Sequence, residues 1–170
     1  MLKNTKKREK YSLDAMDRKI LHLLQRDATL TVQELSRRIN LSPTPCWRRV
    51  QRLEQSGVIQ RRVALLDPDK IGVGVTVFVR IKTRHHTIEW FKQLARAVAA
   101  IPEIVEFYRM SGDTDYLLKI VVPDIAAYDS VYRRLISEVD LEDVSSSFAL
   151  ERIKSTTALP LMYVGGEAGT

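Results

Sequence analysis

The chain has 170 residues, a net charge of +6 and one cysteine, Cys46. A single cysteine excludes an intramolecular disulfide and any cysteine-rich zinc site. The longest apolar runs are far too short to span a bilayer, and no segment has the pattern of a signal peptide. We therefore expect no membrane partner, a cytoplasmic location and room for two small hydrophobic cores.

The charge is distributed unevenly along the chain. Residues 1–62 carry 15 Lys and Arg against 6 Asp and Glu, whereas residues 63–170 carry 12 against 15. A strongly basic part joined to a mildly acidic part is typical of a nucleic-acid-binding module attached to a domain with another task. The basic run within residues 1–12 has no apolar pattern. We expect it to form an unstructured arm that either touches phosphate or only aids solubility.

Three short helices are predicted within residues 13–66. Asp14 can cap the first helix, with Asp17 three residues further on. The second helix begins at a capping box, in which Thr31 and Glu34 can each bond the backbone amide of the other. Periodic apolar residues give both helices an inward face: Met16, Ile20, Leu23 and Leu24 in the first, Val32, Leu35 and Ile39 in the second.

The third helix begins at Ser42, which is a good N-cap, and continues through Pro43 and Pro45, whose missing amide protons cost nothing in the first turn. At about 100° per residue, three residues share an inward stripe: Cys46, Val50 and Leu53. The opposite side is polar and basic: Thr44, Arg48, Gln51, Arg52 and Gln55. Residues 31–50 therefore predict a helix-turn-helix motif.

This outward face has the chemistry that reads DNA, because guanidinium forks match guanine edges or phosphate and amides match adenine. A solvated basic face is the alternative, but the capped start, the stiffened turn and the sorted faces together favour DNA binding. We expect Arg48 and Arg52 to contact base edges or phosphate, with Thr44 and Gln51 reading neighbouring bases. Ser42 and Trp47 are also predicted to contact DNA. Three further arginines are expected to hold the DNA backbone: Arg49, Arg61 and Arg62.

The third helix is expected to end at Gly57. The β-branched run at residues 58–67, which contains Arg61 and Arg62, predicts a strand or a short wing beside the DNA backbone. Asp67, Pro68 and Gly72 then break the chain. We assign residues 13–66 to the DNA-binding domain and residues 67–74 to a linker.

The remaining residues alternate strand and helix patterns. Strands are predicted at residues 73–82, 105–110, 116–122 and 144–154, and helices at 87–100 and 124–139. The order βαββαβ predicts a ferredoxin-like domain at residues 75–161 with both helices on one sheet face, followed by a tail at 162–170. Because the other face must be covered, we expect two such sheets to meet back to back in a dimer.

Three segments resemble the leucine-responsive regulatory protein/AsnC (Lrp/AsnC) family of transcription factors: LDAMDRKIL at 13–21, ELSRRINLSPTPCWRRVQRLEQSGVI at 34–59 and SGDTDYLLKIVVPD at 111–124. The resemblance covers residues 13–161. It implies an α+β protein with an N-terminal, winged-helix-like helix-turn-helix domain and a C-terminal RAM domain that binds amino acids. Residues 81–90 and 144–161 are further similar to the DecR-type branch, which is linked to cysteine detoxification.

The resemblance also implies dimers that build into tetramers or octamers, with a free amino acid bound near Gly112, Asp113, Thr114, Asp115 and Tyr116. Asp113 or Asp115 can accept a bond from the ammonium group, and loop amides at Gly112 can hold the carboxylate. Hydroxyls for the same ligand are expected from Ser155 and Thr156. The alternative is an ordinary turn whose aspartates bond nearby amides, with Tyr116 packed in its strand.

These features predict a regulator that binds a pseudo-palindromic operator in double-stranded DNA and responds to a small amino acid, with cysteine the first choice. We expect no metal and no other cofactor, since the adjacent His85 and His86 cannot easily converge on one ion. One alternative is an architectural protein that coats DNA without an effector. Another is a haem-pathway decarboxylase of the same architecture, which the basic third helix and the scarcity of histidines argue against.

Overall fold

The computed structural model describes residues 12–85 and 87–164, which form parts of two compact units. The first unit contains the residues up to 64 together with those from 154 onward, and the second contains residues 65–153. The predicted arm at residues 1–12 lies almost entirely outside the described residues, as do His86 and most of the predicted tail. No helix in the described ranges is long and apolar enough to cross a membrane.

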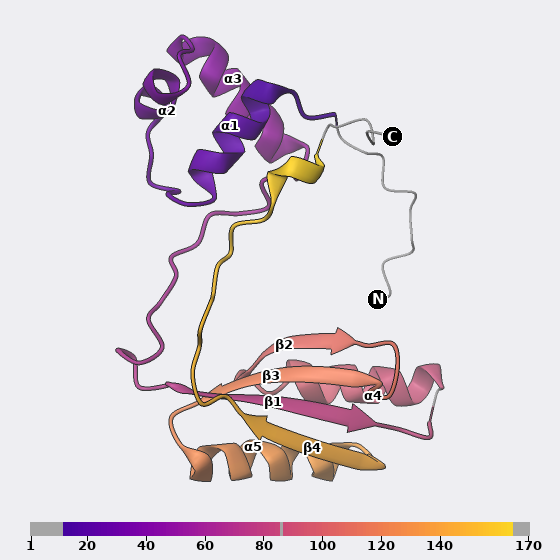
Figure 1. The fold of residues 1–170 in the computed structure, drawn as a ribbon. Helices are drawn as coiled ribbons and strands as arrows, with labels where there is room; N and C mark the ends of the chain where they lie inside the picture. Colours follow the sequence, from indigo (N-terminus) through magenta and orange to yellow (C-terminus); the bar gives the residue numbers. More distant parts are fainter. Residues whose placement is uncertain (1–11, 86, 165–170) are drawn as a thin grey trace. The chain divides into compact units, whose positions relative to one another are not determined.

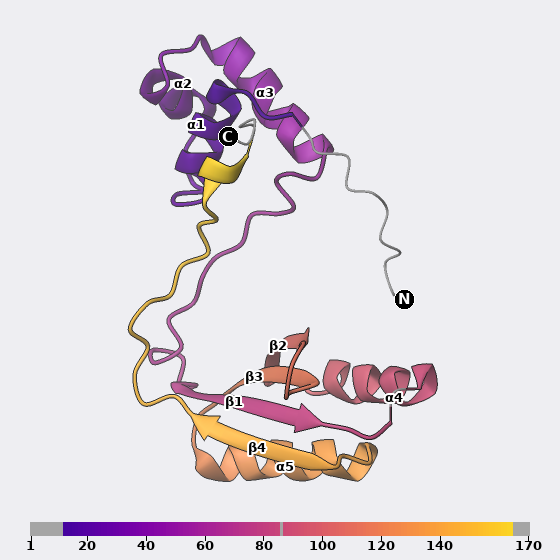
Figure 2. The same ribbon diagram turned by 45° about the vertical axis from the view of Figure 1, so that its right-hand side comes forward.

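The first unit consists of short helices around a small apolar core (Figure 2). Its elements are α1 (Ala15–Leu24), α2 (Val32–Arg38), α3 (Pro43–Gln55) and the short 3-10 helix η1 (Leu161–Tyr163). The inward faces predicted from periodicity are confirmed, because Ile20, Leu35, Val50 and Leu53 are almost fully buried together. These packed faces fix α3 against α1 and leave its opposite side in solvent.

Local hydrogen bonds explain where α1 and α2 begin. The predicted capping box at Thr31 is present, since its amide donates to Glu34 Oε2 at 2.7 Å and its hydroxyl accepts from the Glu34 amide at 3.2 Å. Asp14 and Asp17 form a second capping box at α1. Ser42 occupies the predicted N-cap position of α3 but makes no side-chain capping bond. Asn40 has a positive φ of 55°, a backbone shape that asparagine tolerates, and it turns the chain from α2 into α3.

The strand or wing predicted at residues 58–67 is not observed, because none of those residues is in a strand. A strand needs a partner with which to form its ladder of backbone bonds, and this stretch pairs with no other described segment. Val63, Leu65 and Leu66 are consequently exposed. The predicted break that follows is confirmed, since residues 68–72 form a turn closed by the Val73 amide on the Pro68 carbonyl.

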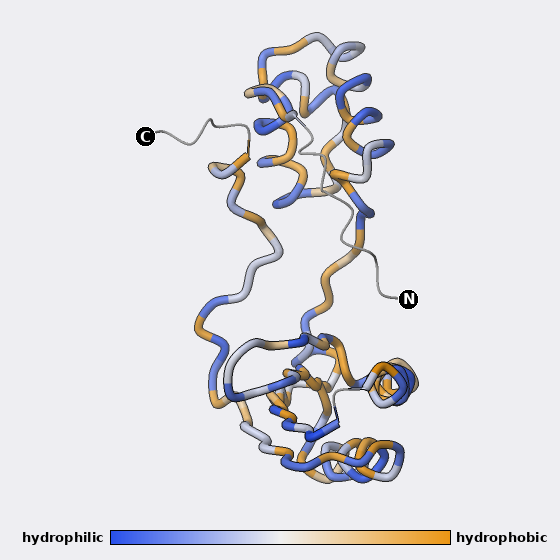
Figure 3. The backbone as a smooth tube through the Cα atoms, turned by 90° about the vertical axis from the view of Figure 1, so that its right-hand side faces the viewer, coloured by the Kyte–Doolittle hydropathy of each residue, from blue (hydrophilic) through white to orange (hydrophobic). Residues whose placement is uncertain are grey.

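The second unit has the predicted βαββαβ order. Its elements are β1 (Val75–Lys82), α4 (Ile88–Ala99), β2 (Ile104–Arg109), β3 (Tyr116–Val122), α5 (Ile125–Glu138) and β4 (Asp143–Phe148). The strands form one antiparallel sheet in the order β2-β3-β1-β4 (Figure 1). Both helices lie on one face of this sheet, and apolar and polar residues alternate along the elements (Figure 3).

The core of the second unit lies between the sheet and its two helices. Alternate residues of β1 are buried as predicted: Val77, Val79 and Ile81. They pack with Leu94 of α4 and Leu135 of α5. The α+β fold predicted from the sequence is therefore confirmed for both parts of the chain.

The predicted last strand is too long. It was expected at residues 144–154, but β4 ends at Phe148. The reason is the length of its neighbour, because β1 begins at Val75 and the Ala149 amide donates to the carbonyl of Thr76. The pairing with β1 stops there, and residues 149–160 are in no strand.

The chain from residue 154 onward belongs to the first unit, whereas the sequence pattern placed residues up to 161 in the second domain. The Gln25 side chain exchanges two hydrogen bonds with the backbone of Leu159, at 2.9 and 3.1 Å. Arg18 donates to the Val164 carbonyl at 2.8 Å, and Leu161 packs on the helical core. The C-terminal segment is therefore part of the fold around α1.

Candidate nucleic-acid interface

The exposed side of α3 presents polar, basic and aromatic groups to solvent. Thr44 and Arg48 are exposed and form no hydrogen bond or ion pair with the part of the chain that the structure describes. Trp47 between them is 51% exposed, a large fraction for an indole ring. Ser42 is exposed at the start of the helix. These four residues offer a guanidinium, two hydroxyls and an aromatic surface that are available for a partner.

Other predicted DNA contacts already have partners within the first unit. The Arg49 guanidinium donates to Asp14 Oδ2 at 2.6 Å and to Asp17 Oδ1 at 2.8 Å. Arg52 Nη2 donates to Asp17 Oδ2 at 2.6 Å. These four residues are called the Asp–Arg cluster below. It turns two predicted DNA-contacting groups toward α1, which differs from the role that the sequence pattern assigned to Arg52.

The Asp–Arg cluster shifts the pKa values of Asp14 and Arg49. The pKa of Asp14 lies below its ordinary value because the Asp17 amide donates to its carboxylate and the Arg49 guanidinium is bonded to it. Hydrogen bonds to Asp14 and Asp17 raise the pKa of Arg49. Both shifts favour the charged forms of Asp14 and Arg49 in the folded protein.

Glu54 connects two further residues of the predicted set. Gln51 Nε2 donates to Glu54 Oε2 at 3.1 Å, and Arg62 Nη2 pairs with Glu54 Oε1 at 3.0 Å. Arg62 also donates to the Ala28 carbonyl at 3.4 Å. Arg61, its neighbour, is exposed and has no polar partner in the described ranges. Arg61 is thus better placed than Arg62 to meet a phosphate without breaking a bond.

The loop between β2 and β3 contains most of the predicted effector site. The Met110 amide donates to the Asp115 carbonyl at 2.8 Å and closes the loop, while Gly112 has a φ of 97°, which glycine adopts without strain. Asp115 is anchored to the end of β1, because its amide donates to the Ile81 carbonyl at 3.1 Å and its carboxylate accepts from the amide of Thr83, just after the strand, at 2.9 Å. The Asp115 carboxylate therefore already has a backbone partner, which lies 32 positions away in the chain and not within the turn.

The remaining effector candidates differ in exposure. Asp113 is exposed and Thr114 is half-buried. Tyr116 is buried in an aromatic cluster, with its ring centroid 5.8 Å from that of Trp90 and 5.6 Å from that of Phe107. Ser155 and Thr156 are exposed but belong to the first unit, so the structure does not group them with the loop.

Comparison with known proteins identifies the family. Residues 13–60 match the winged helix-turn-helix DNA-binding family, and residues 76–159 match the Lrp/AsnC ligand binding domain. The chain is 51% identical over 150 residues to the DNA-binding transcriptional activator DecR of Escherichia coli, which covers 88% of this chain and 99% of that protein. The protein belongs to the Lrp/AsnC family.

Two other relatives support this assignment. The glutamate uptake regulatory protein of Zymomonas mobilis is 52% identical over 156 residues, covering 92% of this chain and 95% of that protein. The crystal structure of a Neisseria meningitidis transcriptional regulator in complex with L-methionine has a TM-score of 0.84 and 39% identity, covering 89% of this chain and 98% of that one. This Lrp/AsnC protein is accordingly a DNA-binding transcriptional regulator, in a family of regulators and not of enzymes.

Cys46 contributes to the core of the Lrp/AsnC helical domain. Its side chain is fully buried, as its position on the inward face of α3 predicts. Burial raises the pKa of its thiol. The group is therefore protonated at neutral pH and acts as a small apolar residue.

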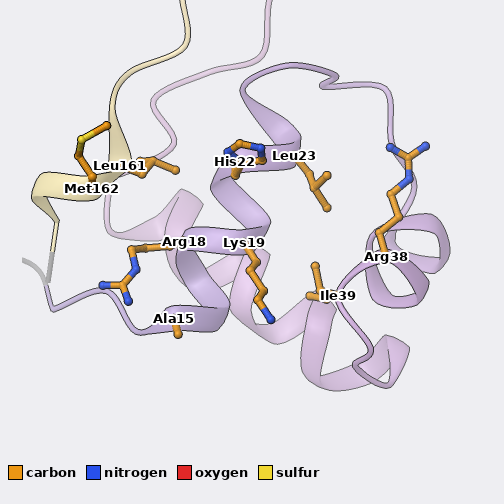
Figure 4. Close-up of a pocket in the computed structure, with 9 residues that line it drawn as sticks. All are labelled: Ala15, Arg18, Lys19, His22, Leu23, Arg38, Ile39, Leu161 and Met162. Atoms are coloured by element: carbon orange, nitrogen blue, oxygen red, sulfur yellow. The ribbon is translucent and has the colours of Figure 1, made fainter.

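A groove of about 530 Å³ lies elsewhere on this domain, between α1, the end of α2 and η1 (Figure 4). Leu23, Ile39 and Leu161 contribute apolar surface, and Arg18 and Arg38 extend at its sides. None of the residues predicted to contact DNA or effector lines it.

Sequence reasoning missed the acidic members of the site. Asp14 and Asp17 were interpreted as helix caps, and Glu54 was not singled out. A usable signal exists for Asp14 and Asp17. One carboxylate is at the N-cap of α1 and the other in its first turn, and two arginines lie three residues apart on one side of α3. Recognising it requires the packing of α1 on α3, which periodicity alone does not give.

Proposed function

We propose that this Lrp/AsnC regulator binds a pseudo-palindromic DNA operator as a dimer, presenting one α3 from each protomer. The carrying observation is the exposed side of α3, where Thr44, Trp47 and Arg48 have no polar partner in the described part of the chain. Their hydroxyl, indole and guanidinium groups can contact base edges or phosphate. Gln51 contributes through the same helix, and Ser42, Arg61 and Arg62 through its flanks, whereas Arg49 and Arg52 are paired with Asp17 and act by positioning α3.

We further propose that a small amino acid bound at residues 112–116 changes the DNA affinity or the oligomeric state, from dimer to tetramer or octamer. Asp113 is the candidate acceptor for the ligand ammonium, because its carboxylate is exposed whereas Asp115 is bonded to Thr83. Amides near Gly112 are the candidate donors to the ligand carboxylate. Thr114, Tyr116, Ser155 and Thr156 are the remaining candidates for its side chain.

The relatives support amino acids as the ligand class but differ in the compound. One is named for glutamate uptake, and another was crystallised with L-methionine. Cysteine is our first choice because residues 81–90 and 144–161 resemble the DecR-type branch, and the chain is 51% identical to DecR. The experiment must therefore compare amino acids rather than assume one.

The test is a DNA-binding titration on the region upstream of the gene, with each of the twenty amino acids in turn. We expect one of them, cysteine first, to change the dissociation constant. Asp113→Asn should remove this response and leave basal DNA binding unchanged. Asp129→Asn, which removes an exposed carboxylate on α5, is the matched control.

Binding that is specific but indifferent to all twenty amino acids would contradict the effector proposal. Binding that is indifferent to DNA sequence as well would support an architectural protein. If an amino acid acts equally on wild type and Asp113→Asn, the effector site lies outside this loop.

A further inference from the structure

Asp17 is a buried charge at the junction of α1 and α3. Its side chain is only 1% exposed. Arg49 Nη1 donates to its Oδ1 at 2.8 Å, and Arg52 Nη2 donates to its Oδ2 at 2.6 Å. The amide of Asp14 also donates to Oδ2, at 3.2 Å. Both carboxylate oxygens therefore have charged partners, as a buried carboxylate requires to offset its desolvation.

The geometry of the Asp–Arg cluster constrains how α3 sits on α1. Arg49 and Arg52 are three residues apart and so lie on the same side of α3, and both reach the first turn of α1. Arg49 also bonds Asp14 at 2.6 Å, so the contact extends along that turn. Charge-assisted hydrogen bonds are directional, whereas the apolar contacts of α3 permit small rotations.

We infer that Asp17 is a positioning residue that determines the specificity of DNA recognition. It fixes the rotation of α3 about its own axis relative to α1, so that Thr44 and Arg48 face the same base pairs in every complex. It also holds two guanidinium groups against α1, where they are withheld from non-specific phosphate contacts. This inference rests on the proposed reading of DNA by α3 and adds residues that do not themselves touch DNA.

The inference predicts a distinctive response to salt. Replacing Asp17 by Asn releases the guanidinium group of Arg52, which is already 51% exposed, and leaves Arg49 bonded to Asp14 alone. Each phosphate that a released arginine contacts steepens the plot of log affinity against log salt by about 0.9. Asp17→Asn should therefore steepen the salt dependence while weakening specific binding. A purely structural role would weaken binding without adding phosphate contacts.

The experiment uses the full chain and two labelled duplexes: one selected by the wild-type protein from a random-sequence pool, and one scrambled duplex of the same composition. Affinities are measured over a series of salt concentrations for wild type, Asp17→Asn, Arg52→Gln and Arg48→Ala. We expect Asp17→Asn to lower the ratio of specific to scrambled affinity at least tenfold and to steepen the slope. Arg48→Ala should lower the same ratio with a slope that is unchanged or shallower.

The inference would be overturned if circular dichroism shows that Asp17→Asn is folded and the variant keeps the wild-type affinity ratio and salt slope. If this variant does not fold, Arg52→Gln decides. A wild-type slope with a reduced ratio supports the positioning role, whereas a shallower slope makes Arg52 itself a phosphate contact and overturns it. A wild-type protein that fails to distinguish the two duplexes would instead contradict the proposed function.

Discussion

We expect direct DNA recognition to depend most on Arg48. Its neighbours on the helix, Arg49 and Arg52, are paired with Asp17, whereas Arg48 is exposed without a polar partner in the described ranges. A long cation held at the centre of a helix face, with Thr44 and Trp47 beside it, is suited to reach the major groove. The sequence assigned the same role to Arg48 and Arg52, and of the two the structure pairs only Arg52 with an acidic side chain among the described residues.

Replacing Arg48 by Ala should weaken binding to the selected operator by about 1–3 kcal/mol if the side chain reads a base. The fold should be unaffected, because the side chain has no polar partner within the described residues. Fluorescence anisotropy on the operator duplex measures the change. Arg37→Ala, an exposed arginine near the end of α2, is the matched control, and equal effects of the two substitutions would refute the assignment.

Asp14 gives stability a defined pH dependence. Its pKa is lowered in the folded protein, so the charged form favours folding. This contribution is fully present above the ordinary carboxyl pKa of about 3.9 and is lost as pH falls through the folded pKa. Asp14→Asn, which can still cap α1, should flatten the decline in unfolding free energy below about pH 3.9. Urea denaturation at several pH values tests this, and an unchanged decline would contradict it.

Periodicity predicted elements well wherever one face of a helix or strand is buried. The bounds of β3 were predicted exactly, and α4 and α5 differ from their predictions by a residue or so at each end. Two errors share one cause, because both concern pairing between distant segments. The end of β4 is set by where β1 begins, and the stretch at residues 58–67 has no partner strand.

In the candidate site too, periodic features could be predicted from the sequence, whereas contacts between distant segments could not. The inward and outward sides of α3 could be read from spacing, because its apolar residues recur every three to four positions. The bond between Gln51 and Glu54 joins neighbours on one helix. The bonds from Asp17 to α3 and from Asp115 to Thr83 could not be predicted from the sequence. Those between α1 and α3 and between the loop and β1 join residues more than thirty positions apart, for which a sequence has no periodic signal.

The C-terminal segment is an element whose docking can be tested directly. The Leu159 amide donates to Gln25 Oε1 at 2.9 Å. Gln25→Ala should remove this hydrogen bond and speed hydrogen exchange at the Leu159 amide about fivefold, which corresponds to a lost hydrogen bond of about 1 kcal/mol. Gln33→Ala, an exposed glutamine on α2, should leave the exchange rate unchanged. An unaltered rate in Gln25→Ala would show that the bond does not hold the segment.

At the scale of the whole molecule, the two parts of the chain differ in both net charge and fold. The basic helical part matches a DNA-binding family, and the acidic sheet part matches a ligand-binding family. With roughly six phosphate contacts per dimer, log affinity should fall against log salt with a slope of about −5. A slope near zero would exclude phosphate contacts as the source of binding.

The most direct test of DNA recognition by α3 is the ratio of affinities for the selected operator and a scrambled duplex at physiological salt. A sequence-specific regulator should prefer the operator by about a thousandfold or more. Substitution of Arg48 by Ala should reduce that preference. Equal affinity for the two duplexes, unchanged in Arg48→Ala, would contradict the account and favour a protein that coats DNA regardless of sequence.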